Sequence, residues 1–257
     1  MKVLNQILVK KVQEIANNAW PASYSYLMDG WILRFNKGIT YRANSVLPLN
    51  WWGEDLYSSV VKVEKGYNQL SLPAIFMLHD NHEPEGLESL LIDRSYKKIM
   101  PTFVMGTETD KLLRTENITT FEFKYTEKRL PIWYPALEEL SPWRTQEKMV
   151  VIGEIIDRVA IPQKRFFYVE HKQRIIGAML AIIDNEFMGI LNLAIDQNYK
   201  RNGIATQLVQ EAADWAISQR IKFIYLQVEK DNIPAVKLYQ KIGFNTWYSY
   251  RYYEKNF

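Results

Sequence analysis

The pattern of apolar and polar positions is clearest in the C-terminal half, where strand-like and helix-like stretches alternate. The apolar run that ends at Ile195 predicts a strand, and polar residues follow it from Asp196 to Asn202. Between Thr206 and Ser218 the chain has neither glycine nor proline. Apolar residues recur there at helical spacing, at Ile204, Leu208, Val209, Ala212 and Ala216. This periodicity predicts an amphipathic helix that begins near Gly203.

A second strand followed by a second helix is predicted after the first helix, beginning about twenty residues beyond its start. The run from Phe223 to Val228 is rich in β-formers and predicts a strand. Asn232 can cap a helix, and Pro234 falls in the first turn, where proline is tolerated. The expected apolar face consists of Ala235, Leu238, Tyr239 and Ile242. Gly243 is placed to end the helix, and Asn232 lies two turns before Tyr239, on the same side.

The N-terminal half has a weaker version of this order. A strand is expected over residues 74–78, a short helix around Leu87 and Leu91, and a second strand over residues 101–105. These elements parallel the run from residue 223 to residue 253, so we expect a degenerate copy of the same unit. In this alignment Leu91 falls opposite Tyr239 and Pro84 falls opposite Asn232.

Further elements of the N-terminal half fit the same plan. We expect a helix near residues 4–16, a helix over residues 55–67, and a hairpin of Trp31–Phe35 with Thr40–Ala43 around Gly38. At the other end of the chain, alternating aromatic residues from Trp247 to Tyr253 predict a strand with one buried face. The polar stretch 106–117 is the expected joint between the two halves.

The segment before the first predicted helix has the chemistry of an anion site. A glycine at a helix start leaves unpaired backbone N–H groups, and the helix dipole favours a phosphate there. Gly203 allows close approach of the backbone, and Lys200 and Arg201 add charged donors. No Gly-Lys-Ser/Thr follows, as a nucleoside triphosphatase needs, and there is no glycine triplet for a dinucleotide. A solvated surface turn is the alternative interpretation.

Together these residues resemble the GNAT superfamily of N-acetyltransferases. The family's acyl-CoA loop has the form Arg/Gln-x-x-Gly-x-Gly/Ala. The corresponding residues here are Lys200, Arg201, Asn202, Gly203, Ile204 and Ala205, with lysine as a departure that keeps the cation. The family's later signature is an asparagine, a tyrosine seven residues on, and then Gly-Phe, which matches Asn232, Tyr239, Gly243 and Phe244.

The resemblance implies a role for each of these positions. The backbone of Leu193, Ala194 and Ile195 would pair with the pantetheine arm of acetyl-CoA, and one of their N–H groups would polarise the thioester carbonyl. The N–H groups from Arg201 to Thr206 would hold the pyrophosphate. Asn232 would contact the cofactor arm. Tyr239 would protonate the departing thiolate after an amine attacks.

One part of the expected machinery is absent. Some family members have a glutamate base on the strand before the asparagine, and Gln227 stands at that position. Glu229 and Asp231 are near in sequence, while a water chain or an acceptor that binds already neutral would serve equally. The alternatives to N-acetyl transfer are a non-catalytic acyl-CoA-binding or interaction protein, which needs no thiolate acid, and transfer to a hydroxyl, which needs a stronger base.

Composition limits the remaining possibilities. The chain has 257 residues, 47% of them hydrophobic, which allows one large or two small domains with a real core. A net charge of +3 gives no reason to expect nucleic acid as a partner. Cysteine is absent, and His79, His82 and His171 are too scattered for a metal site, so we expect no metal. Neither a signal peptide nor a run of membrane-spanning length is visible, so a cytoplasmic protein without membrane contact is expected.

The predicted fold class is α/β, of the α+β type, with two tandem GNAT-like domains. Each is expected to contain a mixed, mostly antiparallel sheet flanked by helices. Residues 1–115 would be the degenerate domain, with an acceptor-side or structural role. Residues 119–257 would be the catalytic domain that binds acetyl-CoA as co-substrate and acetylates a small-molecule or peptide amine.

Overall fold

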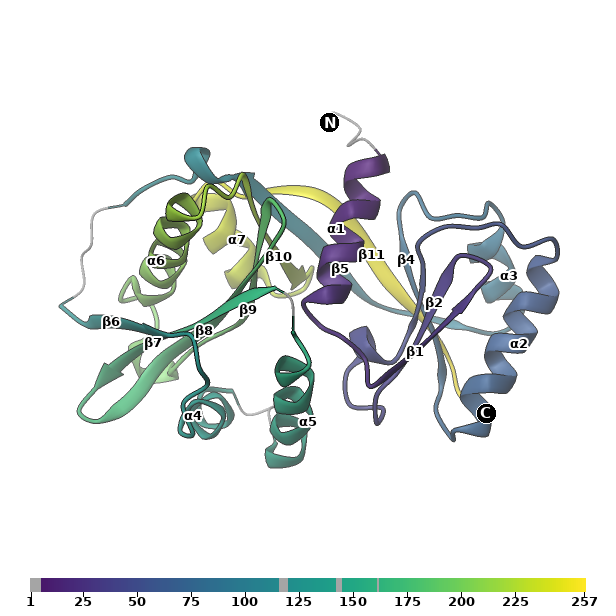
Figure 1. The fold of residues 1–257 in the computed structure, drawn as a ribbon, viewed down its shortest axis with the longest axis horizontal. Coiled ribbons are helices and arrows are strands. Elements are labelled where there is room, and N and C mark those ends of the chain that lie inside the picture. Colours follow the sequence, from purple (N-terminus) through teal and green to yellow (C-terminus); the bar gives the residue numbers. More distant parts are fainter. Residues whose placement is uncertain (1–5, 116–119, 142–144, 161) are drawn as a thin grey trace. The chain divides into compact units, whose positions relative to one another are not determined.

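The computed structural model describes residues 6–115, 120–141, 145–160 and 162–257. Leu4, in the first expected helix, and Thr119, the expected start of the second domain, lie outside the described residues. The chain divides into two compact units (Figure 1). Unit 1 holds the residues up to Phe103 together with Glu229–Asp231 and Trp247–Phe257, and unit 2 holds Val104–Val228 and Asn232–Thr246.

Unit 1 is built on a mixed sheet whose strands follow the order β1-β2-β3-β4-β11, with the first part of β5 beside β11. Its elements are α1 (Gln6–Asn18), β1 (Tyr24–Met28), β2 (Trp31–Phe35), a 3-10 turn (Tyr41–Ala43), β3 (Val46–Pro48), α2 (Leu56–Gln69), β4 (Ala74–His79), α3 (Leu87–Asp93), β5 (Lys97–Glu108) and β11 (Asn245–Lys255). All its described strand pairs are antiparallel except β3 with β4.

The predicted hairpin of Trp31–Phe35 with Thr40–Ala43 is wrong, because Trp31–Phe35 pairs with a different strand. Residues 41–43 form a 3-10 turn, and β2 pairs instead with β1 across the turn at Asp29 and Gly30. These two residues have φ angles of 51° and 91°. An Asp-Gly pair with both φ angles positive is the turn that the twist of a two-residue hairpin favours. This local signal, and not Gly38, decides the pairing.

The core of unit 1 lies between its sheet and the helices α2 and α3. It consists of Trp31, Leu33, Val46, Val60, Val63, Tyr67, Ala74, Phe76, Leu78, Leu87, Leu91, Tyr96 and Tyr253. Arg34 follows Leu33 on β2 and therefore points to the other face, where its guanidinium donates to Asn17 of α1 at 3.3 Å. Helix α1 thus covers the face of the sheet opposite to α2 and α3.

Strand β11 differs from its prediction in burial. Tyr248, Tyr250 and Tyr252 are buried on one face, and Ser249 and Tyr253 are buried on the other. The expectation of a single buried face is therefore wrong. Strand β11 lies between β4 and β5 in the sheet, and Tyr253 on its second face belongs to the core of unit 1. Its register with β4 places Tyr250 opposite His79 and Tyr253 opposite Phe76.

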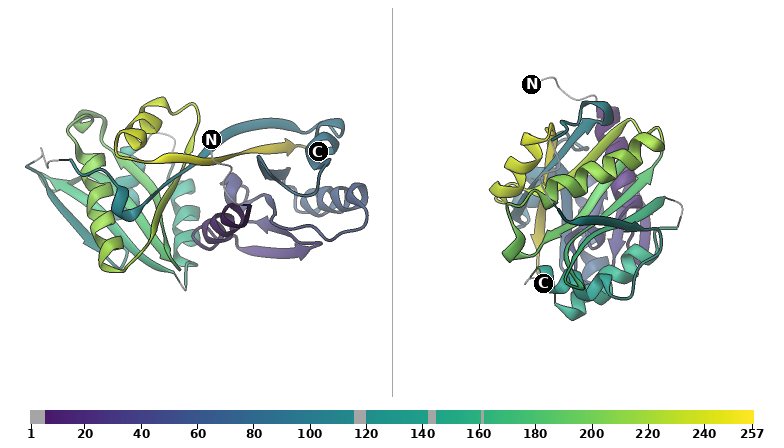
Figure 2. Two further views of the ribbon diagram at one scale, coloured as in Figure 1. Left: turned by 90° about the horizontal axis from the view of Figure 1, so that it is seen from above. Right: turned by 90° about the vertical axis from the view of Figure 1, so that its left-hand side faces the viewer.

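Unit 2 has a sheet in the order β10-β9-β8-β7-β6, with the second part of β5 beside β10. Its elements are β6 (Glu122–Thr126), α4 (Trp133–Leu140), α5 (Gln146–Asp157), β7 (Gln163–His171), β8 (Arg174–Asp184), β9 (Phe187–Ile195), α6 (Ile204–Ser218), β10 (Phe223–Glu229) and α7 (Ile233–Lys241), with short 3-10 turns at Thr109–Lys111 and Gln197–Tyr199. Strands β6 to β9 are antiparallel neighbours, while β9 and β10 are parallel. Helix α6 lies on one face of these strands, and α4 and α5 lie on the other (Figures 1 and 2).

The predicted mixed α/β class and the repeated order of strand, helix and strand are confirmed. Strand β4, helix α3 and strand β5 repeat the order of β10, α7 and β11. The detailed alignment is shifted, because Gly86 caps α3 and Pro84 precedes it, whereas Asn232 itself caps α7. The division into units also departs from the expected joint at 106–117, since β5 and β11 each contribute to both units. The local sequence around β5 and β11 does not predict that each strand contributes to both units.

The buried histidine at the end of β4 makes the stability of unit 1 depend on pH. His79 is 4% exposed, its Nδ1 accepts the Asn81 N–H at 3.2 Å, and its ring packs against Tyr248. Burial lowers the pKa of His79 from 6.5 to about 4, with His82 as a lesser cause. The unfolded chain therefore binds more protons than the folded chain between these two pH values, and folding stability falls as pH falls through this window.

We expect the His79→Phe variant to weaken this pH dependence, because it keeps a ring and removes the titrating group. Between about pH 7.5 and pH 4.5 the parent should lose up to about 3 kcal/mol more unfolding free energy than the variant. Urea unfolding at several pH values measures the difference, and His82→Phe is the matched control at a neighbouring histidine. Equal slopes for the parent and His79→Phe would contradict this assignment.

Candidate active site

The central feature of unit 2 is a parallel strand pair that separates before its strands end. The ladder between β9 and β10 runs from Phe187 opposite Phe223 to Ile190 opposite Leu226. Beyond it β9 continues to Ile195 and β10 to Glu229, with no further pair between them among the described residues. The edge of β9 from Leu191 to Ile195 that faces β10 is thus open for an extended ligand to pair as an added strand.

A β-bulge lies in this open part of β9. On the other side of the strand, β8 pairs Ala178 with Ala194 and Leu180 with Leu191, so two residues of β9 face Met179 alone. One of them, Asn192, has a φ of 54°. Its side-chain amide nitrogen is buried and has no hydrogen-bond partner in the described part of the chain. A buried donor of this kind needs an acceptor, and a ligand on the open edge can supply one.

The loop after β9 ends in the helix start that the sequence predicted. Asp196 accepts the Asn198 N–H at 2.8 Å and so begins a 3-10 turn. Arg201 and Gly203 have φ angles of 64° and 75°, and Gly203 caps α6 without a side-chain hydrogen bond. Within the described ranges, the backbone N–H groups from Arg201 to Thr206 have no backbone acceptor. Free N–H groups at a helix N-terminus can bind an anion.

Two cations stand beside these free N–H groups. Lys200 and Arg201 are exposed, and neither forms an ion pair with a carboxylate of the described residues. The Asn202 amide donates to the Tyr199 carbonyl at 3.3 Å and so holds the loop itself. The local charge is therefore positive and uncompensated, which suits a phosphate or pyrophosphate.

An aromatic cluster fixes the start of this loop. The rings of Phe121, His171 and Tyr199 lie within 5.3 to 5.9 Å of one another in edge-on pairs. Phe121 precedes β6, His171 ends β7, and Tyr199 belongs to the loop. Edge-on aromatic packing of this kind positions the loop on the sheet without using any of its N–H groups.

Helix α7 carries the two residues of the later signature. The Asn232 side chain accepts the Ala235 N–H at 3.4 Å, so its capping role is confirmed, and its exposed position leaves the amide N–H₂ free. Tyr239 is 7% exposed, and its ring lies 5.8 Å from that of Phe244. Burial raises the pKa of the Tyr239 phenol above its ordinary value, so the phenol keeps its proton at neutral pH.

Topology brings these parts to one edge of the sheet. Strands β9 and β10 are parallel neighbours, so their carboxyl ends meet at the same edge. The anion loop follows β9 there, and Asn232 follows β10. Ligands of α/β sheets bind at this kind of edge. Gln227 lies on β10 just beyond the last pair of the ladder and is partly buried, while the exposed Glu229 and Asp231 belong to unit 1.

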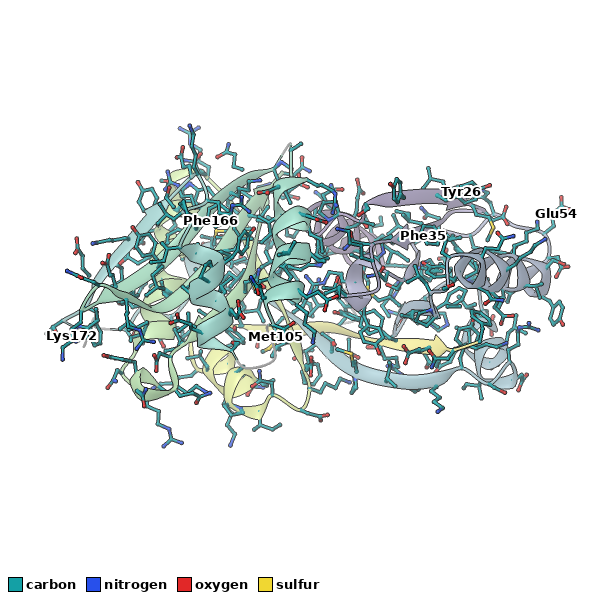
Figure 3. The ribbon with its side chains drawn as sticks, turned by 90° about the horizontal axis from the view of Figure 1, so that it is seen from below. Tyr26, Phe35, Glu54, Met105, Phe166 and Lys172 are labelled. Carbon is teal, nitrogen blue, oxygen red and sulfur yellow. The ribbon has the colours of Figure 1, made fainter. Side chains whose placement is uncertain are left out.

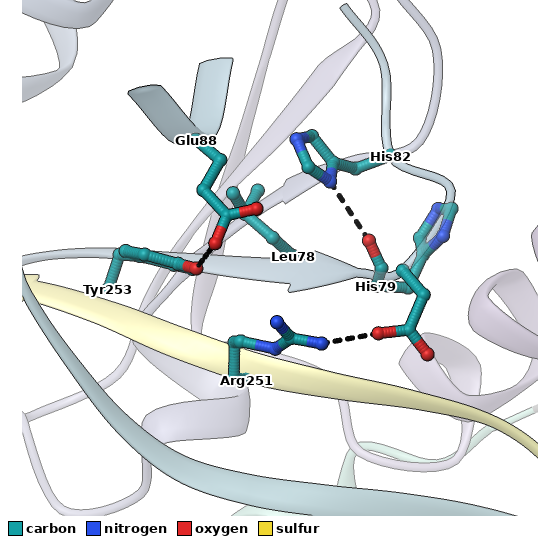
Figure 4. Close-up of a pocket in the computed structure, with 7 residues that line it drawn as sticks. Leu78, His79, His82, Glu88, Arg251 and Tyr253 are labelled. Atoms are coloured by element: carbon teal, nitrogen blue, oxygen red, sulfur yellow. Dashed lines mark hydrogen bonds and ion pairs between the residues drawn. The ribbon is translucent and has the colours of Figure 1, made fainter. Parts of the chain in front are cut away.

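A different polar pocket lies in unit 1, next to the two neighbouring histidines (Figure 4). It measures about 240 Å³ including space open to solvent, and it is lined by Leu78, His79, Asp80, His82, Glu88, Arg251 and Tyr253. Its charged groups pair with one another, because Arg251 donates to Asp80 and Tyr253 donates to Glu88. No group of three His, Cys, Asp or Glu residues that could hold a metal ion exists among the described residues.

None of the helices within the described ranges is both long and apolar enough to cross a membrane.

Comparison with known proteins finds acetyltransferase families in both parts of the chain. Residues 125–244 match the acetyltransferase (GNAT) family, and residues 8–130 match a family described as probable histone acetyltransferase Rv0428c C-terminal. An uncharacterized N-acetyltransferase of Bacillus subtilis, YobR, is 29% identical over 243 residues, which are 92% of this chain and 94% of the relative. An N-alpha-acetyltransferase of Saccharolobus solfataricus is 27% identical over 117 residues, 35% of this chain and 70% of the relative.

Solved structures agree at the level of the fold. A GCN5-related N-acetyltransferase from Kribbella flavida has a TM-score of 0.70 at 9% identity, over 96% of this chain and 95% of its own. A tandem GNAT protein from the clavulanic acid biosynthesis pathway has a TM-score of 0.62 at 7% identity, over 77% and 68% of the two chains. The fold is that of tandem acetyltransferases. The chain is a GNAT-family N-acetyltransferase, as the sequence motifs predicted.

Gly177 permits the close packing on which the loop depends. A Cβ atom at this position of β8 would lie 3.0 Å from Ile195 Cδ1, at the end of β9, and 3.0 Å from Ile204 Cγ2, at the start of α6. Ile204 is fully buried, so it has little room to move. The glycine therefore lets the two ends of the anion loop approach the sheet.

We expect Gly177→Ala to lower the unfolding free energy by about 1 to 3 kcal/mol through overpacking. The matched control is Gly66→Ala in helix α2, where a Cβ would have no neighbour within 4 Å. That change should raise stability by roughly 0.5 to 1 kcal/mol, because alanine is the better helix residue. Urea unfolding followed by circular dichroism measures both, and a neutral or stabilising Gly177→Ala would show that the contact is not tight.

Proposed function

We propose that this N-acetyltransferase uses acetyl-CoA as its co-substrate and transfers the acetyl group to a primary amine. The observation that carries the proposal is the run of free N–H groups from Arg201 to Thr206, next to the open edge of β9. One part of this site offers an anion cradle and the adjoining part offers an unpaired strand edge. A pyrophosphate joined to an extended amide-containing arm, as in coenzyme A, matches both parts.

The residues of the site divide the binding between them. The N–H groups from Arg201 to Thr206, with the cations of Lys200 and Arg201, would hold the pyrophosphate. Leu193, Ala194 and Ile195 would pair with the pantetheine arm through their backbone. The orphaned amide nitrogen of Asn192 fits an acceptor on this arm or on the acyl group, although the sequence patterns did not single this residue out. Asn232 would contact the arm from the start of α7.

Acetyl-CoA supplies an activated acyl group, and the chain's own groups would lower the barrier to its transfer. A backbone N–H on the open edge of β9 would donate to the thioester oxygen as negative charge develops there during attack by the amine. Tyr239 would then donate its proton to the departing sulfur. The phenol is protonated at neutral pH, as a general acid requires, and burial raises its pKa further.

The position of the usual base holds Gln227, which cannot accept a proton at neutral pH. The acceptor would therefore bind as the neutral amine or lose its proton to water. The N-alpha-acetyltransferase named among the relatives supports nitrogen as the acceptor atom. Transfer to a hydroxyl would need a stronger base than this part of the site offers.

We further propose that unit 1 selects the acceptor and carries no chemistry of its own. Its repeat has the buried Leu91 in α3, and nothing in its described sequence corresponds to the loop from Lys200 to Ala205. A fragment beginning near residue 119 would not test this role, because it lacks the β4 strand with which β11 pairs. Charge-changing substitutions on exposed residues of unit 1 test it instead, and they should alter the KM for the amine and leave that for acetyl-CoA unchanged.

We expect the Gly203→Asp variant to bind acetyl-CoA more than about tenfold more weakly than the parent, because its carboxylate would face the phosphates. Isothermal calorimetry should show one site per chain for the parent. Asn198→Asp, which adds the same charge at an exposed position outside this run of N–H groups, is the control for net charge. Two sites per chain, or unchanged affinity in Gly203→Asp, would overturn the assignment.

We expect Tyr239→Phe to lower kcat by about 10² to 10⁴-fold and to change acetyl-CoA affinity little, because the ring stays and only the proton donor is lost. Turnover would be measured with an amine found in a panel of primary amines and peptides. Tyr125→Phe, at a 55% exposed tyrosine of β6, is the control and should leave kcat unchanged. If Tyr239→Phe turns over like the parent, Tyr239 is only a packing residue.

A further inference from the structure

Strand β1 forms one end of the sheet order and pairs only with β2. Its other edge has no strand partner among the described residues. The backbone N–H and C=O groups on that edge are therefore available to another strand.

Large apolar side chains lie exposed along this open edge. Tyr24 is 77% exposed, Tyr26 is 61% exposed and Leu27 is 74% exposed. Figure 3 labels Tyr26 on β1 and Phe35 on the neighbouring strand β2. Tyr24 and Tyr26 pair with Phe35 and Leu33, so they extend the face that forms the core of unit 1 into solvent.

The edge has none of the features that keep sheet edges apart. The sequence of β1 is Tyr-Ser-Tyr-Leu-Met, without charge, proline or glycine. The strand at the other end of the sheet order, β6, shows the contrast, since it carries Glu122 and Lys124. Charged residues on an edge strand oppose pairing with other strands, so β6 is protected and β1 is not.

We propose that β1 pairs with β1 of a second copy of this chain, antiparallel and about a two-fold axis at Tyr26. In this register Tyr26 faces Tyr26 of the other copy, and Tyr24 faces Met28. Aromatic cross-strand pairs stabilise such ladders, and an uncharged strand meets no repulsion from its own copy. A two-fold arrangement also closes the assembly, because each open edge is used once.

The size of the patch sets the strength of the dimer. With about 200 Å² for a buried aromatic side chain, the exposed parts of Tyr24 and Tyr26 amount to roughly 300 Å² per copy. A stable interface buries about 800 Å² per partner. The pairing is thus a reversible one, with a dissociation constant of about micromolar or weaker.

Sedimentation velocity on the full chain, over a roughly hundredfold range of concentration around the micromolar level, tests the proposal. The parent should shift from monomer to dimer. Tyr26→Lys and Tyr26→Glu should each remain monomeric, because they place like charges opposite each other across the two-fold axis. Ile217→Lys, at a 51% exposed position of α6, adds a charge elsewhere and should dimerise like the parent.

The decisive sample is an equimolar mixture of Tyr26→Lys and Tyr26→Glu, whose opposite charges meet in the proposed register. The mixture should form a dimer that neither variant forms alone. Circular dichroism checks that each variant is folded, and Leu27→Lys provides a second disruptive change on the other face of the strand. A monomeric parent, dimers that persist in Tyr26→Lys and Leu27→Lys, or a mixture that stays monomeric would each overturn the proposal.

Discussion

The ladder between β9 and β10 ends at Ile190 and Leu226 although both strands continue, and the rest of the site depends on this early end. Backbone groups inside a protein require partners, so a strand pair that separates creates a row of unmet hydrogen-bonding groups. The bulge at Asn192 occurs on the same stretch and turns β9 locally. The separation therefore leaves an open strand edge, and in the proposed function this edge and the loop from Asp196 to Gly203 would together bind the co-substrate.

The loop before α6 has a positive electrostatic potential and therefore favours a negatively charged ligand. The N-terminus of α6 and the side chains of Lys200 and Arg201 all present positive potential, and no described carboxylate pairs with either cation. Burial acts differently on Tyr239, since it disfavours the phenolate and keeps the proton on the ring. In the proposed function the loop would therefore attract a polyanion, and Tyr239 would be a neutral proton donor.

Local sequence signals were sufficient for the helices that flank the site. Asn232 caps α7, Gly203 adopts the left-handed conformation before α6, and Asp55 accepts two N–H groups at the start of α2. These features depend on a few adjacent residues, which is why they can be predicted. The turn at Asp29 and Gly30 is equally local, but the predicted hairpin has its turn at Gly38 instead.

Other features depend on residues far apart in sequence. The exchange of β5 and β11 between the units follows from pairing with strands more than 100 residues away, and the burial of residues on both faces of β11 is equally non-local. The bulge at Asn192 follows from the register with β8, which no periodicity reveals. For the same reason the sequence named the loop and Tyr239 as site residues but passed over Asn192.

Hydrogen–deuterium exchange with and without coenzyme A tests the central claim most directly, because it follows the backbone N–H groups themselves. Exchange should slow on binding for the amides from Arg201 to Thr206 and for the amides between Leu193 and Ile195 that face the open edge and not β8. The β9 amides that already pair with β8 should change little, as should those of unit 1 in α2. Protection confined to other segments, or none at saturating coenzyme A, would contradict the account.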